Sequence, residues 1–476
     1  MKQSKARTAT PSAQRHPDRT EDRLSSLIAK TNGKYRDLAL LTIVEAAEKA
    51  GGEVTWLTPV AAWVQLQDRK VPLFRQFGAE SAVGAAIATS KSLSKSLLLA
   101  AGVRVPEGYL VKSASEAVEV QQKLDTSVVV KPVGGAFGRG VTANITAPGD
   151  VRAAYELAGR TDGQVIVESY IAGDEYRVHA TADKYVGAFK RLPPNVVGDG
   201  KSTVEELVDA KNDLRRLSPA GLAPIPKNEV TEAYLSNHGK SWNYVPQKGE
   251  KVVVSNVVSL TNGGDSEAVG DSLPLDVATT AMEAVRATPG MRWSGLDVLV
   301  DKKTREGYVI EVNCNAAIDG ASFPMFGHPL DMGAEHWQTY LDHTTPTPTA
   351  EPQVLKPVAE RSSSAAELTM DPSASLADAL RLHLAGQGFE IVQQEGDVWT
   401  AQASDGVLHW FLGARGEKDL RVASQVLAER RMFYRALDLS NIPRPRAKVV
   451  RSLDELRKYQ SEIGTAITLV PGRTHL

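Results

Sequence analysis

The sequence predicts an α/β (α+β) protein, built from strands with alternating hydrophobic residues and from amphipathic helices. Near the N-terminus, Leu40, Val44 and Ala47 fall on one face of a helix. Residues 293–300 and 308–313 instead alternate with the period of two that is typical of strands. The chain has 476 residues, of which 42% are hydrophobic, so it is long enough for two or three domains with real cores.

The next expected elements, in chain order, are a strand over 53–57 and a buried strand over 126–132 that ends in a lysine and a proline. This second strand runs into a segment, 134–140, that contains four glycines. Glycines allow backbone N–H groups to approach an anion closely, and Arg139 adds a positive charge. The segment lacks the Gly-Lys-Ser/Thr ending of a Walker loop, and no helix clearly opens there as in a Rossmann fingerprint.

Two more strands are expected over 164–171 and 185–191, and the second ends in two cations. Cations at strand ends near a phosphate-binding loop favour electrostatic clamping of a transferring phosphoryl group. Beyond them, residues 202–205 predict a capping box that begins a helix through Val208. Residues 213–250 contain four prolines and are expected to be irregular.

The segments 293–300 and 308–313 also predict a metal site. In the second, Glu311 and Asn313 point to one face of the strand. If the two strands pair, Asp297 joins that face, and three oxygen ligands of the kind that Mg²⁺ prefers come together. The alternative reading is an ordinary hairpin with acidic residues on its solvent face.

This order of parts resembles the ATP-grasp superfamily. Within it, residues 80–335 are most similar to the ligase module of cyanophycin synthetases and bifunctional glutathione synthetases. The segments that carry the resemblance are Ser90-Lys91 with Lys95, 101–106, 130–132, 135–140, 167–171, 191–200, 295–297 and 311–313. The resemblance implies an ATP-grasp fold with a preceding small α/β domain.

The resemblance also implies ATP and one or two Mg²⁺ as cofactors, with Mn²⁺ as an alternative ion. Phosphate contacts are implied for Lys91, Lys131 and the loop with Gly135, Gly138, Arg139 and Gly140. Adenine contacts are implied for Glu168 and the backbone through Ile171, and ribose contacts for Glu175. The catalytic set is Arg191, Lys131 and Arg139, and the metal set is Asp297, Glu311 and Asn313.

The implied chemistry is that of an ATP-dependent carboxylate–amine ligase, which makes an amide through an acyl-phosphate from amino acid or peptide substrates. One alternative is an ATP-binding structural or regulatory assembly protein with little or no turnover. A carboxylase or kinase of the same superfamily is another. The run 313–319 lacks the proline that many family members have after the metal asparagine, so the family gives little guide to the substrate here.

The expected organisation is a disordered tail over 1–36, a pre-ATP-grasp domain over 37–88 and an ATP-grasp domain over 89–342. A linker over 343–375 then leads to residues 376–476, which look like a degenerate partial repeat of the pre-ATP-grasp domain and the N-terminal ATP-grasp subdomain. In this second copy Val470 stands where Lys131 stands in the first. A half-module of this kind is expected to expose apolar surface, which favours a homo-oligomer formed through it.

Composition narrows the class of protein. The net charge of −2 gives no strong pull toward nucleic acid, and one cysteine, Cys314, cannot form an intrachain disulfide. No apolar run approaches the ~20 residues of a membrane span. The first residues lack the apolar core of a secretory signal. A cytoplasmic enzyme without a membrane partner is therefore expected.

Overall fold

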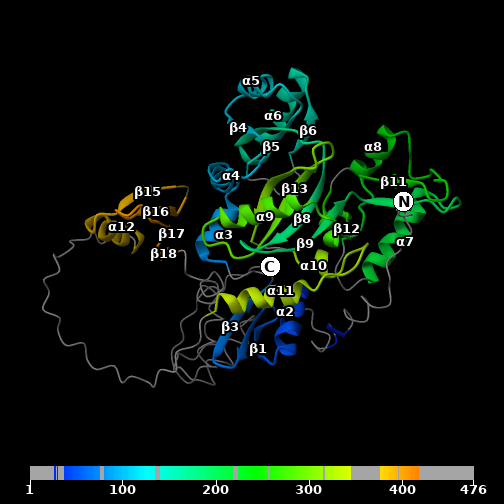
Figure 1. The fold of residues 1–476 in the computed structure, drawn as a ribbon. Coiled ribbons are helices and arrows are strands. Elements are labelled where there is room, and N and C mark those ends of the chain that lie inside the picture. Colours follow the sequence, from blue (N-terminus) through cyan, green and yellow to red (C-terminus); the bar gives the residue numbers. More distant parts are fainter. Residues whose placement is uncertain are drawn as a thin grey trace, which may run out of the picture. The chain divides into compact units, whose positions relative to one another are not determined.

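The computed structural model describes most of the chain between residues 37 and 416 (Figure 1). The described residues are 26–27, 29, 37–75, 80–133, 140–217, 223–255, 258–314, 317–344, 376–394 and 396–416. Most of the expected tail and linker, and residues 417–476 of the expected repeat, lie outside them. The mixture of helices and strands confirms the expected fold class. No helix in the described ranges is long and apolar enough to cross a membrane.

The N-terminal unit is a helix followed by an antiparallel meander. Helix α2 (Leu38–Lys49) begins where the Asp37 carboxylate accepts a hydrogen bond from the backbone N–H of Leu40, at 3.0 Å. Strands β1 (Glu53–Thr58), β2 (Ala61–Leu66) and β3 (Arg69–Phe74) follow in that order.

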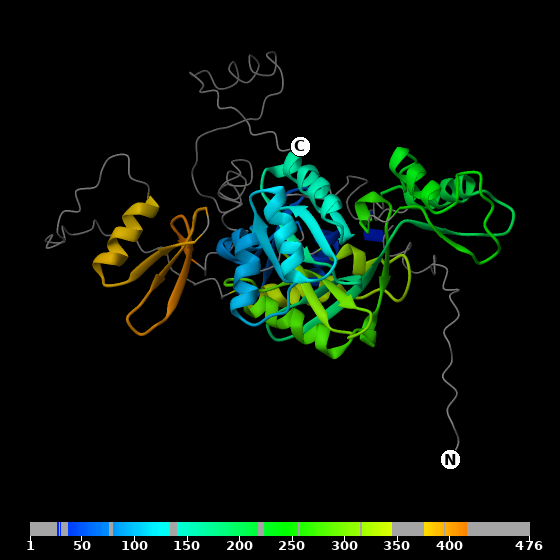
Figure 2. The same cartoon turned by 90° about the horizontal axis from the view of Figure 1, so that it is seen from above.

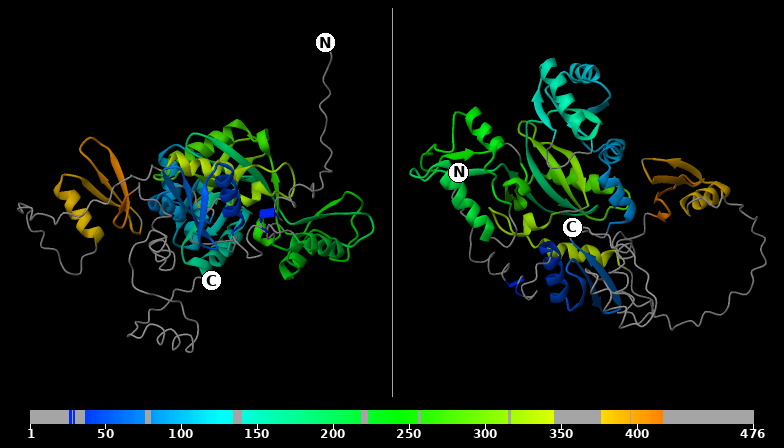
Figure 3. Two further views of the ribbon diagram at one scale, coloured as in Figure 1. Left: turned by 90° about the horizontal axis from the view of Figure 1, so that it is seen from below. Right: turned by 180° about the vertical axis from the view of Figure 1, so that it is seen from behind.

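Helix α2 lies beside helix α11 (Met332–Asp342), as Figure 3 shows, and buried side chains of the two helices belong to one hydrophobic cluster. A Cβ atom on Gly333 would lie 2.4 Å from the Thr42 carbonyl oxygen, so only glycine allows this close crossing.

A second layer carries the lysine-bearing strand. Helices α3 (Ala82–Thr89) and α4 (Lys91–Ala100) precede it, and in the described residues its sheet has four strands in the order β4-β7-β5-β6. Helices α5 (Ala114–Leu124) and α6 (Pro148–Asp162) cover one face, seen in cyan in Figure 2. The strands are β4 (Gly108–Val111), β5 (Val128–Pro132), β6 (Thr142–Ile145) and β7 (Val165–Ser169).

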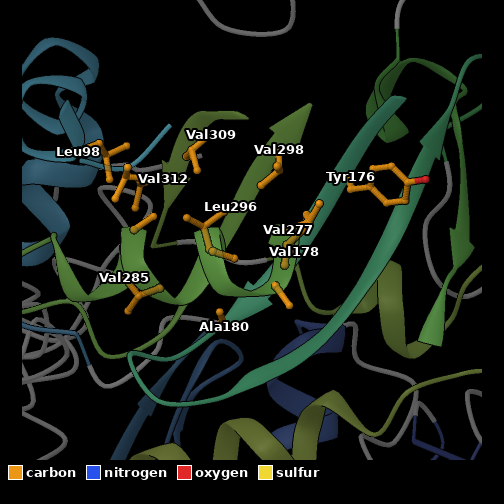
Figure 4. Packing of buried hydrophobic residues seen from close by; sticks show 14 of the residues in the cluster. Leu98, Tyr176, Val178, Ala180, Val277, Val285, Leu296, Val298, Val309 and Val312 are labelled. Atoms are coloured by element: carbon orange, nitrogen blue, oxygen red, sulfur yellow. The ribbon is translucent and has the colours of Figure 1, made fainter. Parts of the chain in front are cut away.

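The central sheet has, among the described residues, five antiparallel strands in the order β12-β9-β8-β13-β14. They are β8 (Gly173–Ala180), β9 (Tyr185–Leu192), β12 (Asp265–Ala268), β13 (Ser294–Asp301) and β14 (Gly307–Asn313). Strand β13 alternates strictly. Its Leu296 and Val298 pack with Val277 and Val285 of helix α9 (Leu275–Arg286), as Figure 4 shows. Asp297 lies between these two strand residues and therefore points to the other face. One face of the sheet is therefore a core, and the other can carry charged groups.

A long excursion joins β9 to β12. It contains β10 (Asn195–Val197), α7 (Val204–Leu217), α8 (Glu229–Asn237), β11 (Lys251–Val253) and the 3₁₀ turn Leu260–Asn262. The capping box of α7 pairs Thr203 with Glu206, so the expected box over 202–205 is wrong by one residue. The expectation of an irregular 213–250 is also wrong in part, because α7 runs to Leu217 and α8 begins at an Asn228–Thr231 capping box.

A buried ionic lock holds both ends of this excursion. The fully buried Asp265 carboxylate accepts from Arg215 and Lys211 of α7, each at 2.6 Å, and from the Asn195 amide at 3.0 Å. Arg215 also donates to the Gly264 carbonyl, at 2.6 Å. The start of the excursion, its main helix and its return are therefore tied to one carboxylate.

We expect Asp265→Ala to destabilise the protein by about 3–5 kcal/mol, because it leaves the buried Arg215 guanidinium without its counterion. Denaturant unfolding measures this loss. The control Glu335→Ala breaks the exposed ion pair with Lys184 and is expected to cost no more than about 1 kcal/mol. Equal losses in the two variants would contradict the lock.

The C-terminal part that the structure describes also begins with a helix and an antiparallel meander. The elements are α12 (Leu376–Gly386), β15 (Glu390–Gln393), β16 (Val398–Gln402), β17 (Leu408–Leu412) and β18 (Arg415–Gly416). Val398 and Trp410 pack against Val83, Ile87 and Leu93 of α3 and α4. The same element order opens the N-terminal unit, and the expected repeat over 376–476 stays a prediction.

Candidate active site

A cavity of about 280 Å³ lies between α4, the four-stranded sheet and β14. Its charged lining comes from Lys91, Lys95, Lys131, Glu168 and Glu311. Apolar side chains form much of the remaining wall, among them Leu98, Leu99, Val105, Tyr109, Leu110, Ile166, Val309 and Ile310. The cavity therefore combines an apolar slot with several ammonium groups, which suits an anion attached to a flat apolar group.

Within this cavity, Lys95, Lys131 and Glu168 form what we call the lysine cluster. The two ammonium groups contact different oxygens of the Glu168 carboxylate, each at 2.5 Å. Burial raises the pKa of Glu168, but the attraction of Lys131 and Lys95 outweighs it, so the pKa lies below its usual value. Burial lowers the pKa of Lys95, against the pull of Glu168.

Strand pairing fixes the position of Glu168. It lies on β7, between β4 and β5, directly opposite Gly108 of β4. A Cβ atom on Gly108 would come within 2.5 Å of the Glu168 Cγ atom. A glycine at position 108 therefore makes room for the carboxylate.

The first turn of α4 presents Lys91 to the cavity. Ser90 caps the helix by accepting from the Leu93 N–H at 3.2 Å. The Lys91 ammonium group lies 3.5 Å from the Glu311 carboxylate on β14. The expected phosphate-binding lysine and one expected metal ligand therefore meet at the same cavity.

Arg177, Arg191, Glu175 and Asp297 form a second group, the arginine cluster, on the charged face of the central sheet. The Asp297 carboxylate accepts from Arg177 at 2.6 Å and from Arg191 at 3.1 Å. Arg191 also contacts Glu175. Burial lowers the pKa of Arg191, but Asp297 and Glu175 outweigh it and the net pKa is raised. Burial raises the pKa of Glu175, against the attraction of Arg191.

The register of β13 and β14 places Asp297 opposite Glu311 and Gly295 opposite Asn313. The two carboxylates therefore project from one face, next to the asparagine. The buried amide nitrogen of Asn313 has no hydrogen-bond partner among the described residues. No group of three or more His, Cys, Asp or Glu side chains in these residues is close enough to hold a metal. Two carboxylates and an amide oxygen still fit Mg²⁺, which usually takes few protein ligands and keeps water or phosphate oxygens.

Not every expected site residue lies within the described residues. Gly135, Gly138 and Arg139 lie outside the described residues. Gly140 follows them with a φ of +72°, a conformation that favours glycine. Ile171 lies between β7 and β8, where its carbonyl accepts from the Gly173 N–H.

Sequence reasoning assigned no role to Lys95 or Arg177. Lys95 lies one helical turn after Lys91, at the spacing that places both on one helix face. Arg177 lies two residues after Glu175, so both side chains project from the same face of the strand. Each spacing places the residue on the same face as an expected site residue, and this could have marked it as a site candidate.

Comparison with known families finds a match over residues 89–195 to the model of the phosphoribosylglycinamide synthetase ATP-grasp (A) domain. The glutathione biosynthesis bifunctional protein GshAB of Clostridium perfringens is 30% identical over 319 residues, covering 63% of this chain and 40% of that protein. Cyanophycin synthetase of a Nostoc species is 28% identical over 259 residues, covering 52% of this chain and 29% of that protein. The chain thus spans less than half the length of these two relatives.

A bifunctional glutathione synthetase from Pasteurella multocida has a similar solved structure, with a TM-score of 0.53 and 24% sequence identity. The match covers 64% of this chain and 43% of that one. This structural similarity supports the fold that the sequence predicted.

Proposed function

We propose that the chain is an ATP-dependent ligase that joins a carboxylate to an amine on amino acid or peptide substrates, and the match of residues 89–195 to an ATP-grasp domain model supports this. The observation that carries the proposal is the meeting of Lys91 and Lys131 with Glu311 at one cavity, beside the arginine cluster. Cations for phosphates and oxygen ligands for a metal are both needed to transfer a phosphoryl group.

In this proposal a substrate carboxylate oxygen attacks the γ-phosphorus of ATP, the bond to the β-phosphate oxygen breaks, and ADP leaves. The amine then attacks the acyl carbon, loses a proton and expels phosphate. Lys91 and Lys131 bind the phosphates, and Arg191, held by Glu175 and Asp297, stabilises charge on the transferred group. Glu311, Asn313 and Asp297 would hold Mg²⁺, which neutralises phosphate charge when bound. We also propose that one or two Mg²⁺ bind there, with Mn²⁺ as an alternative ion.

The test is an ADP-release assay against pooled amino acids and short peptides, with products identified by mass spectrometry. A product with the mass of an amide, formed together with ADP, supports the ligase. Binding of ATP without ADP or amide in any pool would contradict it and favour the regulatory or structural alternative.

We expect Lys131→Met to weaken ATP binding by about tenfold or more, because a positive charge next to the phosphates is lost. Glu168 keeps Lys95 as a partner in this variant, so the melting temperature should change little. Calorimetry with ATP and thermal melting measure both. Lys184→Met, which breaks an exposed pair elsewhere, serves as the control. Wild-type affinity and turnover in Lys131→Met would reject the role.

A further inference from the structure

The lysine cluster has an unusual stoichiometry for a buried ion pair, because two ammonium groups share one carboxylate. Lys95 comes from α4 and Lys131 from the end of β5, and they contact different oxygens of Glu168. The Glu168 side chain is 7% exposed, whereas Lys95 and Lys131 are 14% and 23% exposed. The carboxylate is therefore the most buried member, and both lysines reach the cavity.

The three side chains also differ in freedom of movement. Glu168 lies in an inner strand, with Gly108 on one side and Val129 of β5 opposite it on the other. A lysine carries its charge on a flexible four-carbon stem. When an anion enters the cavity, a lysine can move toward it, while the carboxylate stays in place.

If a single lysine were paired with the buried carboxylate, its movement toward an anion would cost much free energy. Leaving a buried charge without its partner is strongly unfavourable. With two lysines on Glu168, one can turn to an anion while the other still neutralises the carboxylate.

We propose that Glu168 is a counterion shared by Lys95 and Lys131, and that Lys95 binds nucleotide by keeping Glu168 paired when Lys131 turns to the phosphates. The inference rests on the proposed nucleotide site. It assigns a role in nucleotide binding to Lys95. Glu168 stays in place, and a lysine can leave it for the phosphates because the other lysine remains paired with it.

The test is a double-mutant cycle of Lys95→Met and Glu168→Gln, read by calorimetry with ATP and with inorganic tripolyphosphate. Tripolyphosphate has no base, so its binding excludes effects of Glu168 on adenine. In the wild-type background Lys95→Met leaves Lys131 as the one ammonium group on Glu168 among the described residues, and we expect affinity to fall about tenfold or more. In the Glu168→Gln background the carboxylate that held Lys131 is gone, and the same substitution should cost about threefold or less.

Non-additivity of this size for both ligands supports the proposal. Equal effects of Lys95→Met in the two backgrounds would overturn it, because they would show two independent charges. If Glu168→Gln does not fold, Lys95→Arg decides, since it keeps a cation on Glu168. It should stay within about threefold of the wild type while Lys95→Met loses about tenfold. Equal affinities of the Arg and Met variants would overturn the proposal.

These measurements concern binding alone. A protein that shows the coupling but forms no amide would refute the ligase and leave the shared counterion standing. The control Lys184→Met removes an exposed ammonium group from its pair with Glu335, and it should leave affinity for both ligands unchanged.

Discussion

Glu311→Ala is expected to lower Mg²⁺-dependent ATP turnover at least about a hundredfold, because the proposed site would lose a ligand of an ion that contributes several kcal/mol to phosphoryl transfer. Glu311 is a third exposed and pairs only loosely with Lys91, so its loss should cost little stability. Turnover measured over a range of Mg²⁺ concentrations, together with thermal melting, separates loss of metal from unfolding.

Asn313→Ala should act in the same direction, and Glu335→Ala on α11 should leave turnover unchanged. Asp297→Ala is a poorer test, because Asp297 neutralises the buried Arg177 and also pairs with Arg191, so the variant would lose stability as well. A folded Glu311→Ala protein with wild-type turnover at every Mg²⁺ concentration would exclude Glu311 from the proposed metal site.

A second large effect is expected in acid, where the protein should lose stability through His336. Its ring is fully buried, 4.6 Å from the Trp293 ring, and its nitrogens have no hydrogen-bond partner in the described residues. Burial lowers the pKa of His336 from 6.5 to about 3. The unfolded chain therefore binds the proton first as the pH falls, and stability present above pH ~6.5 is lost between there and pH ~3.

Between pH 7.5 and pH 5.0 this histidine alone should remove about 2 kcal/mol of unfolding free energy. His336→Leu should therefore show a shallower pH dependence than the wild type by that amount, whatever its absolute stability. Denaturant unfolding at the two pH values measures the difference. The control His238→Leu replaces an exposed histidine by the same side chain, and it reports what the substitution itself does to the profile. Parallel pH profiles for His336→Leu and wild type would contradict the prediction.

The sequence predicted best those features that local periodicity determines. The alternation in 293–300 and 308–313 corresponds to β13 and β14 within one or two residues, and the apolar face of α2 appears as expected. The lysine that ends the strand over 126–132 lies at the cavity. In each case neighbouring residues hold the whole signal.

Features that depend on distant pairing could not be read in this way. Arg177 meets Asp297 because β8 pairs with β13 in one register, which no local pattern specifies. Lys95 meets Glu168 only when α4 approaches the four-stranded sheet. Helix α8 was missed because its sequence is largely polar, and its signal is the capping box at Asn228.

The ion pairs at Asp265 determine how the long excursion between β9 and β12 could be shortened. Asn195 and Asp265 are in contact, so the long excursion leaves and re-enters the sheet at one place. Strands β9 and β12 are antiparallel neighbours with Leu192 opposite Asp265, the arrangement of an ordinary hairpin. A variant in which a short turn replaces the excursion would therefore also need an apolar residue at position 265, because the buried Asp265 carboxylate would lose both Arg215 and Lys211.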